Sequence, residues 1–234
     1  MVFSDISTNQ GIVQETDFLA NSDSSSYPID QKTRNINQWN SKVVGWIFSA
    51  ANPRFQYDDT NYTTLPFATT DLVSGQSEYR LDASWLDISR VDMQDANGRW
   101  IELKPIDESD IYQTAYDTYQ SVAGTPQEYD LISDVMILKP TPNYSQTAGL
   151  KVFFERSGNS FSPSDTTSSP GFAPQFHRVL SLGAAFDFAL AKQLNQTNSL
   201  RQEIQVVKDE IYEFYGSRNK SEKTQLKTRR ESFR

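Results

Sequence analysis

The chain has 234 residues, of which 37% are hydrophobic and 12% aromatic, and its formal net charge at pH 7 is −8. This length suits one domain with appendages or two small domains, and the aromatic content can fill a core. The sequence has no cysteine, which excludes disulfides, thiolate catalysis and cysteine metal sites. It also has no run of the roughly 18 apolar residues that a membrane span needs, so we expect no membrane association.

The N-terminal residues 1–64 are predicted to form a helical segment. Asp30 can cap a helix that Pro53 brings to an end, and the apolar residues between them recur at the 3.6-residue period of an amphipathic helix. These apolar residues are Ile36, Trp39, Val43, Trp46, Ile47 and Ala50.

Residues 65–156 are predicted to form a small antiparallel β-module. Short apolar runs at 78–81, 85–91, 100–105, 135–140 and 150–156 are separated by turn signals, and Asn97-Gly98 is typical of a hairpin turn. Residues 107–120 interrupt the strands, and Ile111 and Ala115 suggest a short helical insertion there. The fold class is therefore predicted as α+β, with helical segments packed with this sheet.

The C-terminal part begins with residues 157–174, a stretch rich in serine, threonine and proline that we expect to be a mobile loop. Residues 175–216 are then predicted to form a helical hairpin. Its first helix is apolar nearly all round, and the small residues Gly183 to Ala185 would let another element approach closely. Its second helix carries a narrow apolar seam, predicted to pack in the core or against another subunit. This seam consists of Leu200, Ile204, Val207, Ile211 and Phe214.

The chain ends in a basic extended tail, residues 217–234. Residues 218–234 hold seven basic and two acidic side chains, a net +5, which leaves −13 for residues 1–217. Charge runs are usually solvated, but Leu226 and Phe233 interrupt this one with apolar groups. The tail is therefore predicted to contact a partner.

Few residues suggest chemistry. His177 is the only histidine, and a lone histidine at the start of an apolar helix lacks the orienting partner of a general base, so we expect it to be packed. Asp58 and Asp59 could ligate a divalent ion, although adjacent carboxylates in a loop are usually solvated. No phosphate-binding glycine motif occurs. We expect no catalytic residue, no metal, no cofactor and no enzymatic activity.

Trp85 and Trp100 alternate with polar neighbours in two of the predicted strands. An aromatic face for single-stranded nucleic acid is one interpretation, and packing in the core or at a subunit interface is the other. Packing is favoured because no basic residues interleave with these rings along the acidic body.

The order of several short sequence segments resembles that of a known protein family. "YRL", "LDISRV", "NGRWIELKP", "GTPQEYDL" and "VMILKPTP" are followed by a polar loop and then by "FHRVLSLGAA". Over about residues 30–215 this order resembles the head-to-tail adaptor proteins (connectors, or head-completion proteins) of tailed bacteriophages. The likeness lies in pattern and spacing, without an active-site signature.

The resemblance implies a structural virion protein in a homo-oligomeric ring, usually twelvefold. Such a ring lies in the neck of the virion between the portal protein and the tail or tail-terminator proteins, and its subunits are in the host cytoplasm before assembly. Double-stranded DNA passes through the lumen during genome packaging and ejection. The resemblance also implies that a C-terminal extension contacts the portal, for which the tail offers Leu226, Lys227, Arg229, Arg230 and Phe233.

A different class of function is also open. The same basic tail could serve a nucleic-acid-binding module, in which the tail grips DNA or RNA while the acidic body engages a partner.

Overall fold

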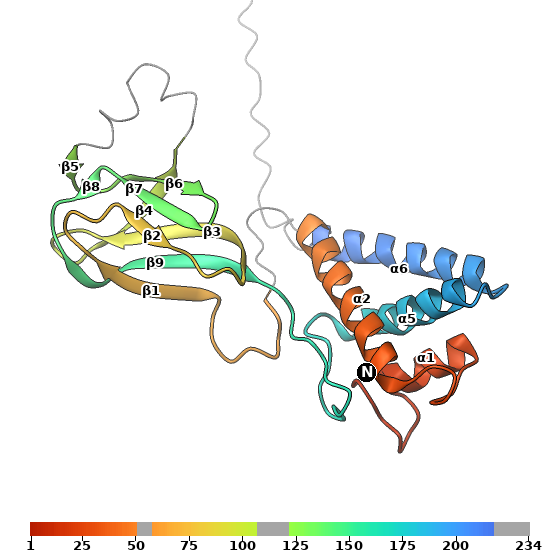
Figure 1. The fold of residues 1–234 in the computed structure, drawn as a ribbon. Helices are drawn as coiled ribbons and strands as arrows, with labels where there is room; N and C mark the ends of the chain where they lie inside the picture. Colours follow the sequence, from red (N-terminus) through yellow and green to blue (C-terminus); the bar gives the residue numbers. More distant parts are fainter. Residues whose placement is uncertain (51–57, 107–121, 218–234) are drawn as a thin grey trace, which may run out of the picture. The chain divides into compact units, whose positions relative to one another are not determined.

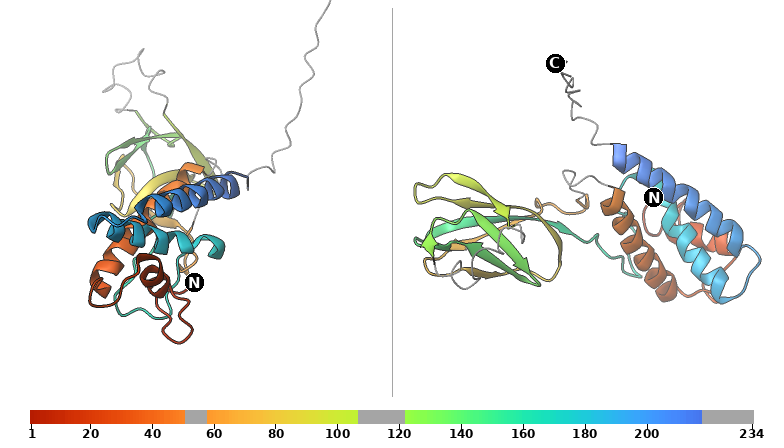
Figure 2. Two further views of the ribbon diagram at one scale, coloured as in Figure 1. Left: turned by 90° about the vertical axis from the view of Figure 1, so that its right-hand side faces the viewer. Right: turned by 90° about the horizontal axis from the view of Figure 1, so that it is seen from above.

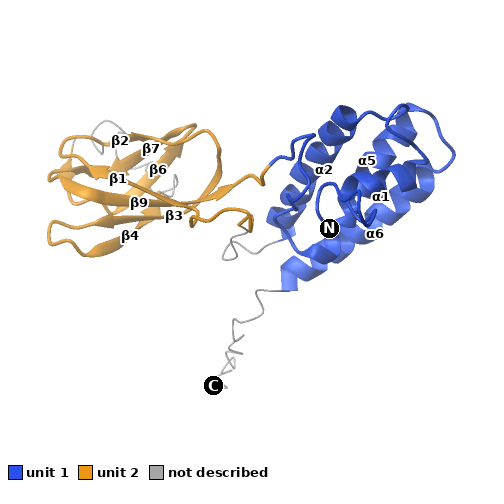
Figure 3. Ribbon diagram, turned by 90° about the horizontal axis from the view of Figure 1, so that it is seen from below, with its two compact units in different colours: residues 1–57, 160–234 blue, residues 58–159 orange. Residues whose placement is uncertain are grey.

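The computed structural model describes residues 1–50, 58–106 and 122–217. The chain divides into two compact units, with residues 1–57 and 160–234 in unit 1 and residues 58–159 in unit 2 (Figure 3). Unit 1 is helical and unit 2 is built from strands (Figure 1). The predicted α+β class is therefore confirmed, and the β-unit is an insertion between two helical stretches of the chain.

The described part of unit 1 contains four α-helices: α1 (Ile12–Ala20), α2 (Ile29–Ala50), α5 (Arg178–Ala191) and α6 (Thr197–Ser217). A short 3-10 helix, η1 (Pro174–Phe176), precedes α5. Helices α2, α5 and α6 pack against one another, and α1 packs against α5 (Figure 2). Asp30 lies inside the first turn of α2 and does not precede it, so its charge favours the helix N-terminus without capping it.

The apolar stripe of α2 lies at the centre of the unit 1 core. Ile36 and Ile47 are fully buried, and the nearly buried Trp39 packs directly on Gly183 of α5. A Cβ atom at Gly183 would overlap the Trp39 indole, whose Nε1 donates a hydrogen bond to Asp187 at 2.8 Å. The close approach predicted at the small residues of α5 is therefore made by a tryptophan.

Residues 157–174, predicted as a mobile loop, contribute two aromatic side chains to the unit 1 core. Phe161 and Phe172 are both buried, and Phe161 stacks on Phe3 with ring centroids 5.0 Å apart. The Asn37 amide holds the backbone of Phe161, donating to its carbonyl at 2.9 Å and accepting from its N–H at 2.8 Å. Serine and proline dominate the composition of the stretch, so the sequence pattern does not reveal these two anchors.

Unit 2 is a curled seven-stranded sheet with the strand order β1-β9-β3-β4-β6-β7-β2, beside a two-stranded ladder of β5 and β8. Its strands are β1 (Phe67–Leu72), β2 (Glu78–Arg80), β3 (Trp85–Gln94), β4 (Trp100–Pro105), β5 (Ala123–Gly124), β6 (Glu128–Ile132), β7 (Val135–Lys139), β8 (Thr141–Pro142) and β9 (Gln146–Arg156). The core on the inner side of the curl includes Leu72, Val91, Met93, Met136 and Leu150, all fully buried.

The predicted hairpin is present, but the sheet is not purely antiparallel. Strands β3 and β4 pair antiparallel around the turn that contains Gly98, whose φ of +77° suits glycine. Strands β4 and β6 pair in parallel, as do β5 and β8. The antiparallel prediction is wrong at β4 and β6 because a long connection, residues 106–127, joins them. Such a connection allows the crossover that a parallel pair needs.

Two predictions fall outside the described residues. These are the short helical insertion at 107–120 and the five portal-docking residues of the tail.

Candidate functional site

His177 is a packed residue in unit 1. It is 3% exposed, with Nε2 2.9 Å from the Phe172 carbonyl oxygen and Nδ1 2.9 Å from the Met1 amino nitrogen. A carbonyl oxygen only accepts hydrogen bonds, so Nε2 of the neutral ring donates. Nδ1 then accepts from the amino group and makes only a non-bonded contact with the Met1 carbonyl oxygen, 3.1 Å away. Burial lowers the pKa of His177, which favours this neutral form. In the described parts of the chain, no acidic or serine side chain bonds to the ring.

Asp58 and Asp59 are engaged by protein groups, so the expectation of solvated carboxylates is wrong. Asp58 accepts two hydrogen bonds from the guanidinium of the largely buried Arg156, at 2.8 and 3.0 Å. Asp59 is 2% exposed and accepts from the backbone N–H groups of Asn61 and Asn159, both at 2.8 Å. The two carboxylates thus tie together the places where the chain enters and leaves unit 2.

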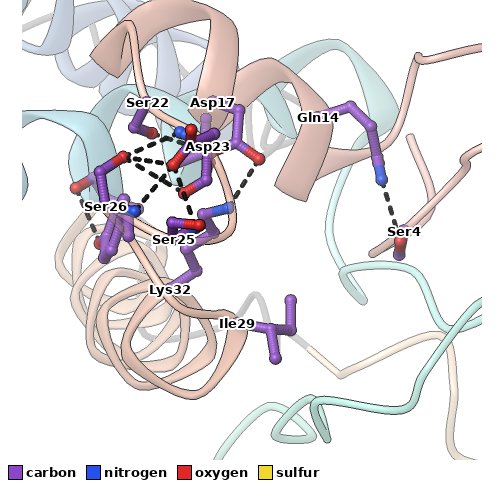
Figure 4. Close-up of polar contacts among 12 residues, drawn as sticks. Ser4, Gln14, Asp17, Ser22, Asp23, Ser25, Ser26, Ile29 and Lys32 are labelled. Atoms are coloured by element: carbon purple, nitrogen blue, oxygen red, sulfur yellow. Dashed lines mark hydrogen bonds and ion pairs between the residues drawn. The ribbon is translucent and has the colours of Figure 1, made fainter.

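A polar cluster joins α1 to the start of α2 (Figure 4). Lys32 is 2% exposed, and its Nζ lies 2.6 Å from Oδ2 of Asp17. Oδ1 of Asp17 accepts a hydrogen bond from the Ser22 hydroxyl at 2.8 Å. Asp23 closes the connecting turn by accepting from the N–H of Ser26 at 2.8 Å. A neutral buried lysine can act as a nucleophile, but this ammonium is bound to a carboxylate and links two helices. No sequence pattern points to Lys32, because it lies among the polar residues of α2.

The predicted apolar seam lies on α6 (we call it the α6 seam) and faces the core of its own unit. Leu200, Ile204 and Ile211 are buried there, whereas Val207 and Phe214 are partly buried against the same core. Tyr215, the residue after Phe214, takes the fully buried place predicted for Phe214. Its hydroxyl accepts a hydrogen bond from the backbone N–H of Ala173 at 3.1 Å. The seam therefore follows α6 one position further than predicted at its C-terminal end.

The outer side of the unit 2 sheet carries aromatic rings and cations together. Phe67 is 37% and Trp100 is 43% exposed, and Lys151 lies between them, with its Nζ 5.2 and 4.4 Å from the two ring centroids. Arg90 lies 5.9 Å from the ring centroid of Phe153. We call these five residues the aromatic face. Basic residues thus interleave with the rings across neighbouring strands, which the linear sequence does not show. Trp85, by contrast, stacks on Phe154 and packs against the core.

A second surface of unit 2 is acidic and partly apolar. A groove of about 430 Å³ is lined by Leu86 and Leu131, which are 55% and 40% exposed, together with three aspartates. Asp134 is paired with Arg80 at 3.0 Å. The exposed Asp82 and Asp87 accept hydrogen bonds from nearby backbone N–H groups, and neither takes part in an ion pair formed by described residues. We call Asp82, Leu86, Asp87, Leu131 and Asp134 the acidic groove.

The charge of the chain is divided between its parts. Residues 58–159, which form unit 2, hold seventeen acidic and seven basic side chains, a net −10. Residues 1–57 and 160–234 hold thirteen acidic and fifteen basic side chains, a net +2, of which the tail contributes +5. The acidic body recognised in the sequence is therefore mainly unit 2.

Among residues 1–50, 58–106 and 122–217, no group of three or more His, Asp or Glu side chains lies close enough together to hold a metal ion. No helix within these ranges has the length and apolar content to cross a membrane. Comparison with protein-family models and with curated protein sequences finds no match.

Proposed function

We propose that this protein is the subunit of a head-to-tail adaptor ring of a tailed bacteriophage, which joins the portal to the tail and continues the DNA channel. The observation that carries the proposal is the division of charge, with −10 in unit 2 and +5 in the tail. A negatively charged wall repels phosphates, so a duplex can slide past it where a basic wall would hold it. The order of sequence segments shared with adaptor proteins supports the same proposal.

In this proposal the ring is homo-oligomeric, usually with twelve copies, and lies in the virion neck between the portal and the tail or tail-terminator proteins. Its interfaces are heterologous, because a closed ring of more than two identical subunits needs head-to-tail contacts. Electron microscopy of the purified full chain, alone and mixed with portal protein, tests this directly. A closed ring is expected, and a protein that stays monomeric in both conditions contradicts the proposal.

The tail is the proposed portal contact. Lys227, Arg229 and Arg230 can pair with carboxylates, which the planar guanidinium bonds bidentately, and Leu226 and Phe233 can fill apolar pockets. Each contact is weak alone, but a ring engages many copies at once, which raises the avidity.

Deletion of residues 218–234 tests this contact, because it removes the basic run and leaves α6 entire. The truncated protein is expected to unfold at the wild-type temperature and to lose attachment to portal-bearing heads. A full-length variant with only the five docking residues changed to Ser is the matched control, because it removes the proposed contacts without shortening the chain. It is expected to lose attachment as the truncated protein does. Undiminished attachment of the truncated protein would show that the tail makes no portal contact and is only a solvated end of the chain.

The alternative is a nucleic-acid-binding module, which the tail's net charge of +5 favours. Phosphate binding by several cations weakens steeply as salt rises, because counterions are released. A monomer that binds duplex DNA in low salt, and loses that binding when residues 218–234 are deleted, would support this alternative against the adaptor ring.

A further inference from the structure

We propose that neighbouring copies of this protein meet through unit 2, with the aromatic face of one copy seated in the acidic groove of the next. This inference rests on the proposed ring and names the surfaces that build it. The partner is thus a second copy of this chain.

The aromatic face supplies a cation without an acidic partner among the described residues. Arg90 is paired with Asp92 at 2.6 Å and lies 3.6 Å from Glu102, whereas Lys151 takes part in no ion pair formed by described residues. Its ammonium lies between two exposed rings, Phe67 and Trp100. In a unit of net charge −10, this site offers a positive charge between two exposed rings, and its cross-strand neighbour Asp92 is paired with Arg90.

The acidic groove offers the complementary features. Asp82 and Asp87 are exposed carboxylates without a cationic partner among the described residues, and Leu86 and Leu131 expose apolar surface beside them. A lysine that enters such a groove gains an opposite charge, and the aromatic rings beside it lose contact with water against the leucines. The groove volume of about 430 Å³ lies within the roughly 300–1,000 Å³ of small-molecule pockets, so side chains can enter it.

Charge also limits where two copies can meet. Two units of net charge −10 repel each other across most of their surfaces, so a favoured contact is one that brings a cation to carboxylates, each without an ion-pair partner among the described residues. The aromatic face cannot reach the groove of its own copy, because β3 carries Arg90 and Leu86 on one continuous strand. The contact is therefore between copies.

The two surfaces differ, so each copy uses its aromatic face once and its acidic groove once. When the face and the groove of one copy engage two different neighbours, the contact is heterologous and propagates head to tail into a closed ring or a filament, whereas in a two-fold dimer the same two copies would make both contacts with each other. The proposed ring requires this type of contact.

Charge reversal in the full chain tests the inference. Lys151→Glu and Asp87→Lys are each expected to raise the protein concentration needed for ring formation, measured by mass photometry and sedimentation, at least about tenfold, because each places like charges together. The double variant and an equimolar mixture of the two single variants both restore opposite charges at every contact, so both are expected to regain rings. Arg201→Glu and Glu203→Lys, exposed on α6 of unit 1, are matched controls expected to assemble normally.

The outcomes separate this inference from the adaptor proposal. If the wild type forms rings and both single variants form them at the same concentration, the inference is wrong and the adaptor proposal stands. If the wild type forms no ring alone or with portal protein, the adaptor proposal fails, and the inference fails with it. If both single variants lose assembly but neither the double variant nor the mixture recovers it, Lys151 and Asp87 do not meet, which also overturns the inference. Thermal melts of each variant confirm that loss of assembly is not loss of fold.

Discussion

The buried imidazole of His177 makes the stability of this protein depend on pH. Burial lowers its pKa in the folded state, so on acidification the unfolded chain binds this proton first, near the ordinary pKa of about 6.5. Stability is therefore expected to fall as the pH drops through about 6.5, until the pKa of the folded state is passed. His177→Gln keeps a donor for the Phe172 carbonyl and removes the titration. Melting temperatures of both proteins between pH 8 and 5 check this, and parallel curves would contradict it.

The Lys32 ammonium depends on its carboxylate partner. Asp17→Ala leaves a cation buried without compensation and is expected to cost about 3 kcal/mol of unfolding free energy, while the double variant Asp17→Ala/Lys32→Met is expected to recover most of that loss. Urea unfolding of the wild type, both single variants and the double variant measures the coupling. Additive effects would show that the 2.6 Å contact contributes no coupling energy.

At the scale of elements, two glycines in helices are expected to respond in opposite ways to alanine. A Cβ atom at Gly183 overlaps the Trp39 indole, so Gly183→Ala is expected to destabilise unit 1 by about 1–3 kcal/mol despite alanine's better helix propensity. A Cβ atom at Gly45 of α2 meets no atom within 4 Å, so Gly45→Ala is expected to stabilise by about 0.5–1 kcal/mol. Thermal unfolding measures the change in stability of each variant. Changes of the same sign in both variants would refute the close approach of α2 and α5.

The α6 seam yields a second expectation at this scale. Ile204→Ala and Ile211→Ala each open a cavity in the unit 1 core and are expected to lower the unfolding free energy by about 2–5 kcal/mol. Gln202→Ala, exposed on the same helix, is the control and should change little. Wild-type melting temperatures for both isoleucine variants would show that the seam is not buried in solution.

The elements that sequence reasoning predicted are those fixed by local periodicity. The helical stripe of α2, the hairpin at Gly98 and the small residues of α5 each have a pattern within a few residues. The parallel pairing of β4 with β6 has no such pattern, because it is decided by tertiary contacts between strands far apart in sequence. The same holds for the cluster of Lys151, Phe67 and Trp100, whose members come from three different strands.

At the scale of the whole molecule, unit 2 is expected to fold by itself. Its entry and exit are joined by the contacts of Asp58 with Arg156 and of Asp59 with Asn159, and its core is made from its own strands. Residues 58–159 expressed alone should therefore unfold cooperatively, and Asp59→Ala should lower the midpoint. Circular dichroism and dispersed amide resonances check this, and a disordered fragment would show that unit 1 is required.

The insertion of unit 2 between α2 and α5 has a consequence during synthesis. The ribosome completes α1 and α2 first, then makes the whole of residues 58–159, and only afterwards releases α5 and α6. At about 5–20 residues per second, roughly 7–29 s pass between the synthesis of Trp39 on α2 and that of Gly183, against which it packs. The nascent helices thus expose an apolar surface while the sheet folds, and this interval is when the chain is most open to aggregation or to a chaperone.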